Sequence, residues 1–382
     1  MDKVALGQRV AQARENKGMT QAGLGSAVRL DRTAISRLEK GVRKLNVAEL
    51  VDIAEVLGRP LSYFVGESVP AVVSRRNDVA HAHATTGLLD TELDQFASDV
   101  RTLLSMGLLD AADRATSARV PKGHQATEDA AAQSRQQAGL GTGPINDLGQ
   151  ACERLGLFTF SAPLGASGVD GGCVEVEHEG GTVGVAVVNG DAAPARRRMT
   201  LAHELGHWLF GDAYDSEASL SSEKMINSFA IHYLAPRAGV TNVWEQHSSW
   251  HTRERALAVG ASFRLSWSAA LGQLRNVQLI SRRDFETLIE NEPRHGEYLR
   301  LGLTWVDELT APYLSPAVVS AVLNAYTDGR LTASRTLELL RGTLVADGLP
   351  PQRSRSMEDL RSSFLTFRTS RTGYLVDCAG CV

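Results

Sequence analysis

Two histidines flank a glutamate in the stretch MTLAHELGHWLF, residues 199–210. His203 and His207 are four residues apart, so on a helix both imidazoles lie on one face and can bind one metal ion. Glu204 lies beside them, where its carboxylate can take a proton from water held at that ion. The pattern also occurs by chance in amphipathic helices, so neighbouring segments must support a metal site.

A catalytic zinc site usually takes three protein ligands and keeps one position open. We favour Glu223 as the third ligand, because it begins a predicted helix over residues 223–235 and shares a face with Asn227. Asn227 would then hydrogen-bond one of the ligands. Glu217 is the competing ligand, and Glu223 could instead cap the start of its helix.

A second polar cluster lies near the N-terminus, around the run DRTAISRLEKG at residues 31–41. Short helices are expected after Thr20, Asp31 and Asn46, which are typical N-cap residues. Arginine and threonine can read base edges in the major groove, and basic residues after such a helix suit phosphates. The candidate DNA contacts are Gln21, Arg32, Thr33, Ser36, Arg37, Arg43 and Lys44.

Charge is distributed unevenly along the chain, whose formal net charge is −4. Residues 1–65 hold 11 Lys and Arg against 7 Asp and Glu, an excess of +4, and the remainder holds 29 against 37, a deficit of −8. A basic first unit on an acidic body favours binding to duplex DNA. The alternative for this unit is a small helical interaction module that does not touch DNA.

Hydrophobic periodicity separates helices from strands in the rest of the chain. Helical spacing is expected in Leu88–Leu109, Thr127–Leu140, Ile145–Leu155, Arg196–Phe210 and residues 253–341. Strand patterns occur in Leu157–Phe160, Gly172–Glu177 and Val183–Asn189. We therefore predict a multidomain, mainly α-helical chain with one small sheet before the histidine helix.

The segments around that helix resemble the ImmA/IrrE metallopeptidases. The resemblance rests on Arg196–Arg198, on TLAHELGH, on Val188-Asn189 and on the Glu-x-x-x-Asn-x-Phe-Ala and Leu-x-Pro pattern within residues 223–236. It implies an α+β zincin-like domain with zinc as cofactor, Glu223 as third ligand and a protein substrate. Two residues depart from the family: Ile226 replaces the usual alanine, and His232 replaces a small or apolar residue.

Residues 4–65 resemble the XRE-type helix-turn-helix, which implies an all-α domain that binds a DNA operator. A homodimer is expected, because such modules read paired half-sites. Arg29 stands in a turn where glycine is frequent. The expected units are a helix-turn-helix domain at 1–66, a linker and helical extension at 67–143, a peptidase core at 144–250, C-terminal helices at 251–349 and a poorly ordered tail at 350–382.

Composition is that of a globular protein, with 43% hydrophobic and 22% charged residues. The sequence contains no apolar run long enough for a bilayer, no signal-peptide core at Met1–Ala5 and only four cysteines, so we expect a cytoplasmic protein without membrane contact. Cys378 and Cys381 have metal-ligand spacing but no second cysteine pair, so we interpret them as part of a tail without a metal site. His247 and His251 lack a glutamate partner and are interpreted as structural.

The resulting hypothesis is a DNA-binding regulatory zinc endopeptidase that cleaves a specific partner such as a transcriptional repressor. Glu204 would be the general base and later the proton donor to the leaving amine. His232, Tyr233 and Arg196–Arg198 are candidates for stabilising the oxyanion. The alternative is a transcriptional regulator or antitoxin-like repressor whose peptidase-like domain senses or binds a partner without cleaving it.

Overall fold

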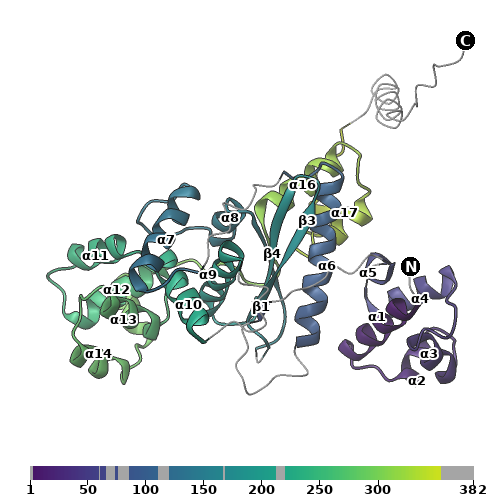
Figure 1. Cartoon of the computed structure of the whole chain (residues 1–382), viewed down its shortest axis with the longest axis horizontal. Helices are drawn as coiled ribbons and strands as arrows, with labels where there is room; N and C mark the ends of the chain where they lie inside the picture. Colours follow the sequence, from purple (N-terminus) through teal and green to yellow (C-terminus); the bar gives the residue numbers. More distant parts are fainter. Residues whose placement is uncertain are drawn as a thin grey trace, which may run out of the picture.

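The computed structural model of this chain describes residues 3–59, 61–65, 74–75, 86–110, 120–166, 168–211 and 220–353. The competing ligand Glu217, the cysteines Cys378 and Cys381, and the predicted tail after residue 353 lie outside the described residues. A group of N-terminal helices lies at one end, a sheet in the middle and a second group of helices at the other end (Figure 1). Within the described part, no helix has the length and apolar composition needed to cross a membrane.

The N-terminal unit consists of five helices: α1 (Lys3–Asn16), α2 (Gln21–Ala27), α3 (Arg32–Glu39), α4 (Val47–Leu57) and α5 (Leu61–Val65). The three expected N-caps are confirmed: the side chains of Thr20, Asp31 and Asn46 accept the amides of Gly23, Ala34 and Glu49 at 3.0, 2.6 and 2.8 Å. Arg29 takes the left-handed conformation, with φ of 58°, that glycine would otherwise supply.

Five strands form the sheet: β1 (Ser74–Arg75), β2 (Leu157–Ala162), β3 (Gly171–His178), β4 (Gly181–Asn189) and β5 (Tyr313–Leu314). Their order is β1-β3-β4-β2-β5, with β2 parallel to β4 and the other pairs antiparallel. The three predicted strands are confirmed. Sequence periodicity missed β1 and β5, because two residues are too few for an alternating pattern.

Alternation along β4 divides the hydrophobic core between the two faces of the sheet. Val183, Val185 and Val187 face one core, and Ala186 and Val188 face the other. The first face is covered by α6 (Thr86–Ser105), α16 (Pro316–Thr327) and α17 (Ala333–Leu339). The second is covered by α8 (Leu148–Glu153) and α9 (Pro194–Phe210), and α10 (Leu220–Leu234) and α7 (His124–Gln137) pack beyond α9 in the same core.

These two cores extend across the positions at which we placed domain boundaries. The first core joins residues from 89–109, 158–187 and 314–340, and so spans the expected linker, peptidase core and C-terminal region. The boundaries at 143 and 250 remain predictions. The segments on either side of each boundary nevertheless bury their apolar residues together.

A third core holds together the helices beyond α10, which are α11 (Arg237–Gln246), α12 (Thr252–Phe263), α13 (Trp267–Asn276), α14 (Arg282–Ile289) and α15 (His295–Arg300). The prediction that residues 253–341 form helices is confirmed by α12–α17 but is wrong at 301–315. There the chain turns at Gly302 and Leu309, whose φ values are 67° and 58°, and then enters β5. A short 3-10 turn, Ala346–Gly348, follows α17.

Helix α6 also contacts the N-terminal unit. Arg59 binds Glu92 at 2.9 Å, and Arg9 lies close enough to Asp94 to attract its charge. Burial in this contact and the nearby Asp90 outweigh the attraction of Arg9, so the pKa of Asp94 is raised to about 6. Because the pKa of Asp94 is higher in the folded protein than in the unfolded chain, this group contributes to stability below the ordinary aspartate pKa. That contribution is lost as the pH rises through the pKa of the folded state.

We therefore expect Asp94→Asn to alter the pH dependence of stability. The folded wild type carries the cost of an ionised Asp94 above about pH 6, whereas the asparagine variant does not. The variant should unfold at a higher temperature than the wild type at pH 7–8, and the difference should shrink towards pH 4. Thermal unfolding followed by circular dichroism measures this, and a difference that grows towards acid pH would contradict the assignment.

Candidate metal centre and DNA-binding helix

Helix α9 carries the histidine pair and is buried along most of its length. It begins with Pro194, whose fixed φ suits the first helical position, and ends at Gly211, whose φ is 65°. The residues from Thr200 to Phe210 are all buried. Trp208 is 1% exposed and donates its indole N–H to the carbonyl of Leu155 at 2.8 Å. These contacts fix both the position and the rotation of α9.

Gly206 allows α10 to lie close against α9. A Cβ atom at Gly206 would lie 3.1 Å from the side chains of Ile226 and Phe229, which is tighter than ordinary contact. Ile226, the residue that departs from the family pattern, is fully buried in this contact. The close approach brings the first turns of α10, including Glu223, over the histidines of α9.

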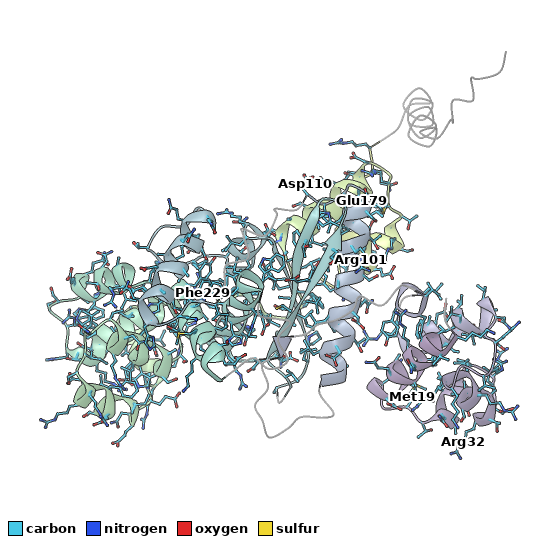
Figure 2. The ribbon with its side chains drawn as sticks, in the orientation of Figure 1. Met19, Arg32, Arg101, Asp110, Glu179 and Phe229 are labelled. Carbon is cyan, nitrogen blue, oxygen red and sulfur yellow. The ribbon has the colours of Figure 1, made fainter. Side chains whose placement is uncertain are left out.

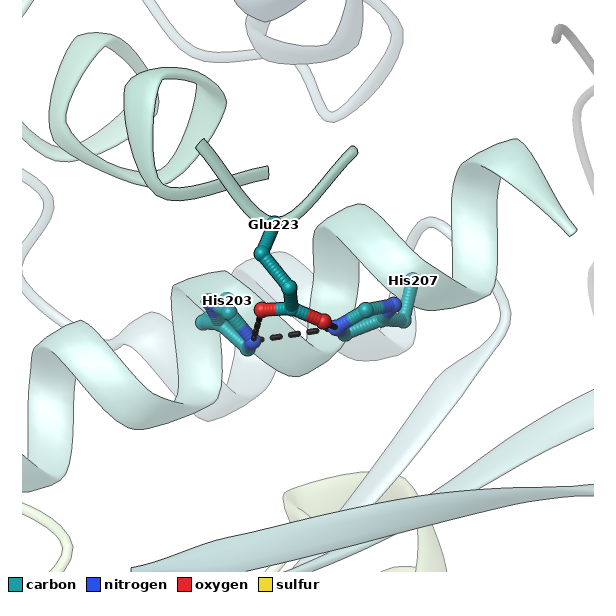
Figure 3. A group of neighbouring side chains, drawn as sticks. All are labelled: His203, His207 and Glu223. Atoms are coloured by element: carbon teal, nitrogen blue, oxygen red, sulfur yellow. Dashed lines mark hydrogen bonds and ion pairs between the residues drawn. The ribbon is translucent and has the colours of Figure 1, made fainter. Parts of the chain in front are cut away.

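The side chains of His203, His207 and Glu223 converge on one point (Figure 3). The two Nε2 atoms of the histidines are 2.9 Å apart, and each lies 3.5 Å from a carboxylate oxygen of Glu223. In a tetrahedral zinc site with bonds of about 2.0–2.1 Å, neighbouring donor atoms lie about 3.3 Å apart. The donor set and its spacing therefore fit a single zinc-sized ion.

The environment of the histidines also suits metal binding. Burial lowers the pKa of His207 to about 4, so this imidazole is neutral at physiological pH and keeps a lone pair for a ligand bond. His203 points its Nδ1 at the Oδ1 of Asn227, 3.1 Å away, as the helical spacing of Glu223 and Asn227 led us to expect. This contact fixes the ring orientation and leaves Nε2 to face the cluster.

Glu204 is fully buried, and it lies four residues from both Thr200 and Trp208, which contact β3 and β4. Its backbone carbonyl lies 3.7 Å from the thiol of Cys173 on β3. At about 100° per residue, Glu204 lies about 100° around the helix from His203 and about 60° from His207. It is therefore close to the cluster without sharing the direction of the two histidines. On the other side of the cluster, the side chain of Glu223 is 41% exposed.

The candidate oxyanion residues have other partners in this structure. Arg197 donates to the carbonyls of Gly190, Ala192 and Glu308, and Arg196 binds Asp170 at 3.0 Å. Arg198 is ion-paired with Glu308. His232 is buried and lies 3.2 Å from the side-chain amide of Gln273, and Tyr233 stacks on Phe229. None of these contacts involves the metal cluster, and the oxyanion residue remains unassigned.

The N-terminal unit presents α3 to solvent. Figure 2 shows Arg32 on the outer side of this unit, far from Phe229 beside the metal cluster. Ile35 and Leu38 are buried beneath α3. The predicted contacts Arg32, Thr33, Arg37 and Lys44 are exposed, and Gln21, Ser36 and Arg43 are half-buried.

Two of the predicted DNA contacts are held by carboxylates. Gln21 donates to Glu39 at 2.7 Å, and Glu39 also binds the buried Arg14. Arg43 makes two hydrogen bonds to Glu49, at 2.6 and 3.0 Å. Sequence reasoning missed these pairs because one joins α2 to α3 and the other joins a loop residue to the start of α4. They orient Gln21 and Arg43, whereas Arg32 and Arg37 are exposed on α3.

Comparison with known families agrees with both parts of this description. Residues 10–64 match the family model for a helix-turn-helix, and residues 152–274 match the model for an IrrE N-terminal-like domain, the M78 peptidase family. Residues 10–64 are thus similar to XRE-type helix-turn-helix domains, and residues 152–274 to IrrE/ImmA-like M78 peptidase domains. The second match includes β2–β4, α9 and α10, and so contains the metal cluster.

Individual relatives cover much less of the chain. Two HTH-type transcriptional regulators named RamB, from Mycobacterium tuberculosis strains CDC 1551 / Oshkosh and ATCC 25618 / H37Rv, are each 31% identical over 94 residues. That match covers 25% of this chain and 18% of each regulator. No solved structure is significantly similar to the chain.

The contact between Asn227 and His203 generates a prediction about metal affinity. Removing a hydrogen-bond partner of a ligating histidine typically weakens metal binding about 10–100-fold. We expect Asn227→Ala to do so while the fold is retained, because Asn227 is only half-buried. Competition with a chelator measures the affinity. Ser228→Ala, the next residue on α10, is the control, and equal affinities for both variants would contradict the role of Asn227.

Proposed function

We propose that this chain is a DNA-binding regulatory zinc endopeptidase that cleaves a specific protein partner such as a transcriptional repressor. The observation that carries the proposal is the convergence of His203, His207 and Glu223 beside the buried carboxylate of Glu204. Zinc bound by these three residues would polarise a peptide carbonyl and acidify water. The membership of residues 152–274 in a peptidase family supports the same chemistry.

Each residue near the metal cluster would have a distinct role in peptide hydrolysis. Asn227 orients His203, and burial keeps His207 in its neutral form. Glu204 accepts the proton of the attacking water on a carboxylate oxygen and then delivers it to the leaving nitrogen. Because the side chain of Glu223 is partly exposed while both histidines are buried, a substrate would approach from the Glu223 side.

The N-terminal unit would hold the proposed enzyme at a specific site on DNA. Exposed Arg32 and Arg37 on α3 would enter the major groove of an operator, with Lys44 at a phosphate. A homodimer would place two copies of α3 on paired half-sites. Cleavage would then be confined to partners that meet the chain at its operator, which suits a regulatory rather than a digestive role.

A second candidate function is a regulator that binds a partner without cleaving it. The observation that favours it is the similarity of 94 residues to regulators named for transcriptional control. In that case the metal cluster would stabilise the fold or sense zinc. The two functions differ in whether Glu204 is needed for the loss of the partner, which is directly measurable.

Replacing Glu204 tests the proposed chemistry. Elemental analysis of the purified wild type should find about one zinc ion per chain, and Glu204→Gln should keep it, because Glu204 is not a ligand. Removal of a general base typically lowers the rate about 10²–10⁴-fold. Cleavage of candidate repressors co-expressed with the chain should therefore nearly stop. The control, His203→Ala with His207→Ala, should lose the zinc.

Two results would count against the endopeptidase. Wild-type rates of cleavage by Glu204→Gln would show that Glu204 is not the base. A wild type that binds zinc and DNA but leaves every co-expressed partner intact would favour the second candidate function.

DNA recognition by α3 gives a separate prediction. A best duplex selected from a random pool should bind the full chain with strong salt dependence. Because a bidentate arginine contact contributes about 1–3 kcal/mol, Arg32→Ala with Arg37→Ala should weaken binding at least about tenfold. The matched control removes two exposed arginines from α14, as Arg282→Ala with Arg283→Ala. Gel shifts giving equal affinity for both double variants would exclude α3 as the recognition helix.

A further inference from the structure

A cavity of about 370 Å³ lies at the N-terminal end of α9, away from the metal cluster. It is enclosed by α9, α12, α13, α15 and the segment 305–308. Sites for small molecules usually have volumes of about 300–1,000 Å³. Arg198 lines the cavity and lies about 140–180° around the helix from His203 and His207 at about 100° per residue. The cavity and the metal cluster are therefore separate sites.

The inner wall of the cavity, formed by Arg198, Arg264 and Glu308, holds two guanidinium groups and one carboxylate. Arg198 and Arg264 share a single carboxylate, that of Glu308, which also accepts the amide of Leu148. Arg198 is 1% exposed, and among the described residues no acceptor lies within hydrogen-bonding distance of its Nε. One terminal nitrogen, Nη1, is ion-paired with Glu308, and both terminal nitrogens lie 3.5 Å from the carbonyl of Ile145.

Such a surplus of buried charge is costly unless an anion compensates it. Burial and the neighbouring Arg264 lower the pKa of Arg198 to about 9, which is the expected response of a guanidinium with too little negative charge nearby. A ligand that brought one carboxylate into the cavity would supply the missing charge and an acceptor for Nε.

The start of α9 adds a second attraction for an anion. Ala193, Pro194 and Ala195 line the cavity, and no side chain caps this end of the 17-residue helix. Pro194 has no N–H, and the amides of Arg196 and Arg197 bond to the carbonyl of Ala193, so this end offers an anion the amide of Ala195 and the helix dipole. The helix end and the guanidinium groups therefore lie around the same space.

The outer walls are aromatic and apolar. Trp267, Tyr298 and Trp305 line them, and the rings of Tyr298 and Trp305 meet edge to face with centroids 5.1 Å apart. Trp305 is 38% exposed, so its ring is available to a ligand. Glu292 and Asp307, both exposed, stand at the mouth and would repel polyanions such as nucleotides.

We propose that this cavity binds a small aromatic carboxylic acid, with its carboxylate against Arg198 and Arg264 and its ring against Tyr298 and Trp305. One negative charge matches the surplus of the inner wall, and a single ring matches the aromatic outer walls. The proposal does not depend on the proposed peptidase activity, because no residue of the metal cluster lines the cavity.

Three probes of similar shape but different charge test whether the cavity prefers an anion. Calorimetric titration of the full chain should detect binding of 3-phenylpropanoate. The uncharged 3-phenylpropanamide should bind at least about tenfold more weakly, because it loses a charged hydrogen bond. The cationic 3-phenylpropylamine should not bind. The proposal is overturned if the acid fails to bind at millimolar concentration, if the amide binds as tightly as the acid, or if the amine binds more tightly than either.

Two cavity variants, each with a matched control, test whether the probe binds in this cavity. Arg264→Ala and Trp305→Ala should each lower the affinity for 3-phenylpropanoate at least about tenfold. The matched controls are Arg282→Ala on α14 and Trp250→Ala, whose ring stacks on His247 outside the cavity. Circular dichroism and thermal unfolding verify that all four variants fold. Unchanged affinity in both cavity variants, or an equal loss in the controls, would place the probe elsewhere and refute the site.

Discussion

The packing of α9 between the sheet and α10 is the constraint on which the rest of the structure depends. This helix must be buried on almost every side and still carry polar groups. Gly184 on β4 makes room for the ring of Trp208, since a Cβ there would lie 2.7 Å from it, and Gly206 makes room for α10. Polar side chains on so deep a helix are stable only where they find partners. The carbonyls around Arg197, the carboxylate of Glu308 and the amide of Asn227 supply them.

The parts of this arrangement that follow from local rules could be predicted from the sequence. N-caps at Thr20, Asp31 and Asn46, alternation along β4, and the four-residue spacing of His203 and His207 each act within one element. The helical face shared with Asn227 led us to place Glu223 towards the histidines, and its carboxylate oxygens lie 3.5 Å from their Nε2 atoms. The strands β1 and β5, the turn at Leu309 and the pair Arg43–Glu49 could not be predicted. The strands and the turn depend on contacts with segments that are remote in sequence, and the pair Arg43–Glu49 depends on how the loop before α4 folds back on that helix.

Helix α6 joins the two halves of the molecule physically. One of its faces packs on the sheet, and its Glu92 binds both Arg59 of the N-terminal unit and Arg341 after α17, at 2.9 and 3.1 Å. Because the carboxylate of Glu92 binds two guanidinium groups, the loss of one arginine would leave the other to orient it. The contact leaves α3 exposed. The proposed DNA binding by α3 and the docking on α6 would therefore use different faces of the N-terminal unit.

The burial of Glu204 bears on the choice between an enzyme and a binding protein. A carboxylate that is 0% exposed costs free energy to desolvate, even where it has partners. An apolar side chain at that position of α9 would pack against the sheet without this cost. A domain that only held a metal for stability would need His203, His207 and Glu223 but gain nothing from Glu204. The desolvation of Glu204 has a reason if its carboxylate must lie close to the cluster, out of bulk water, to transfer a proton there. This argument favours hydrolysis over binding alone, independently of the family match.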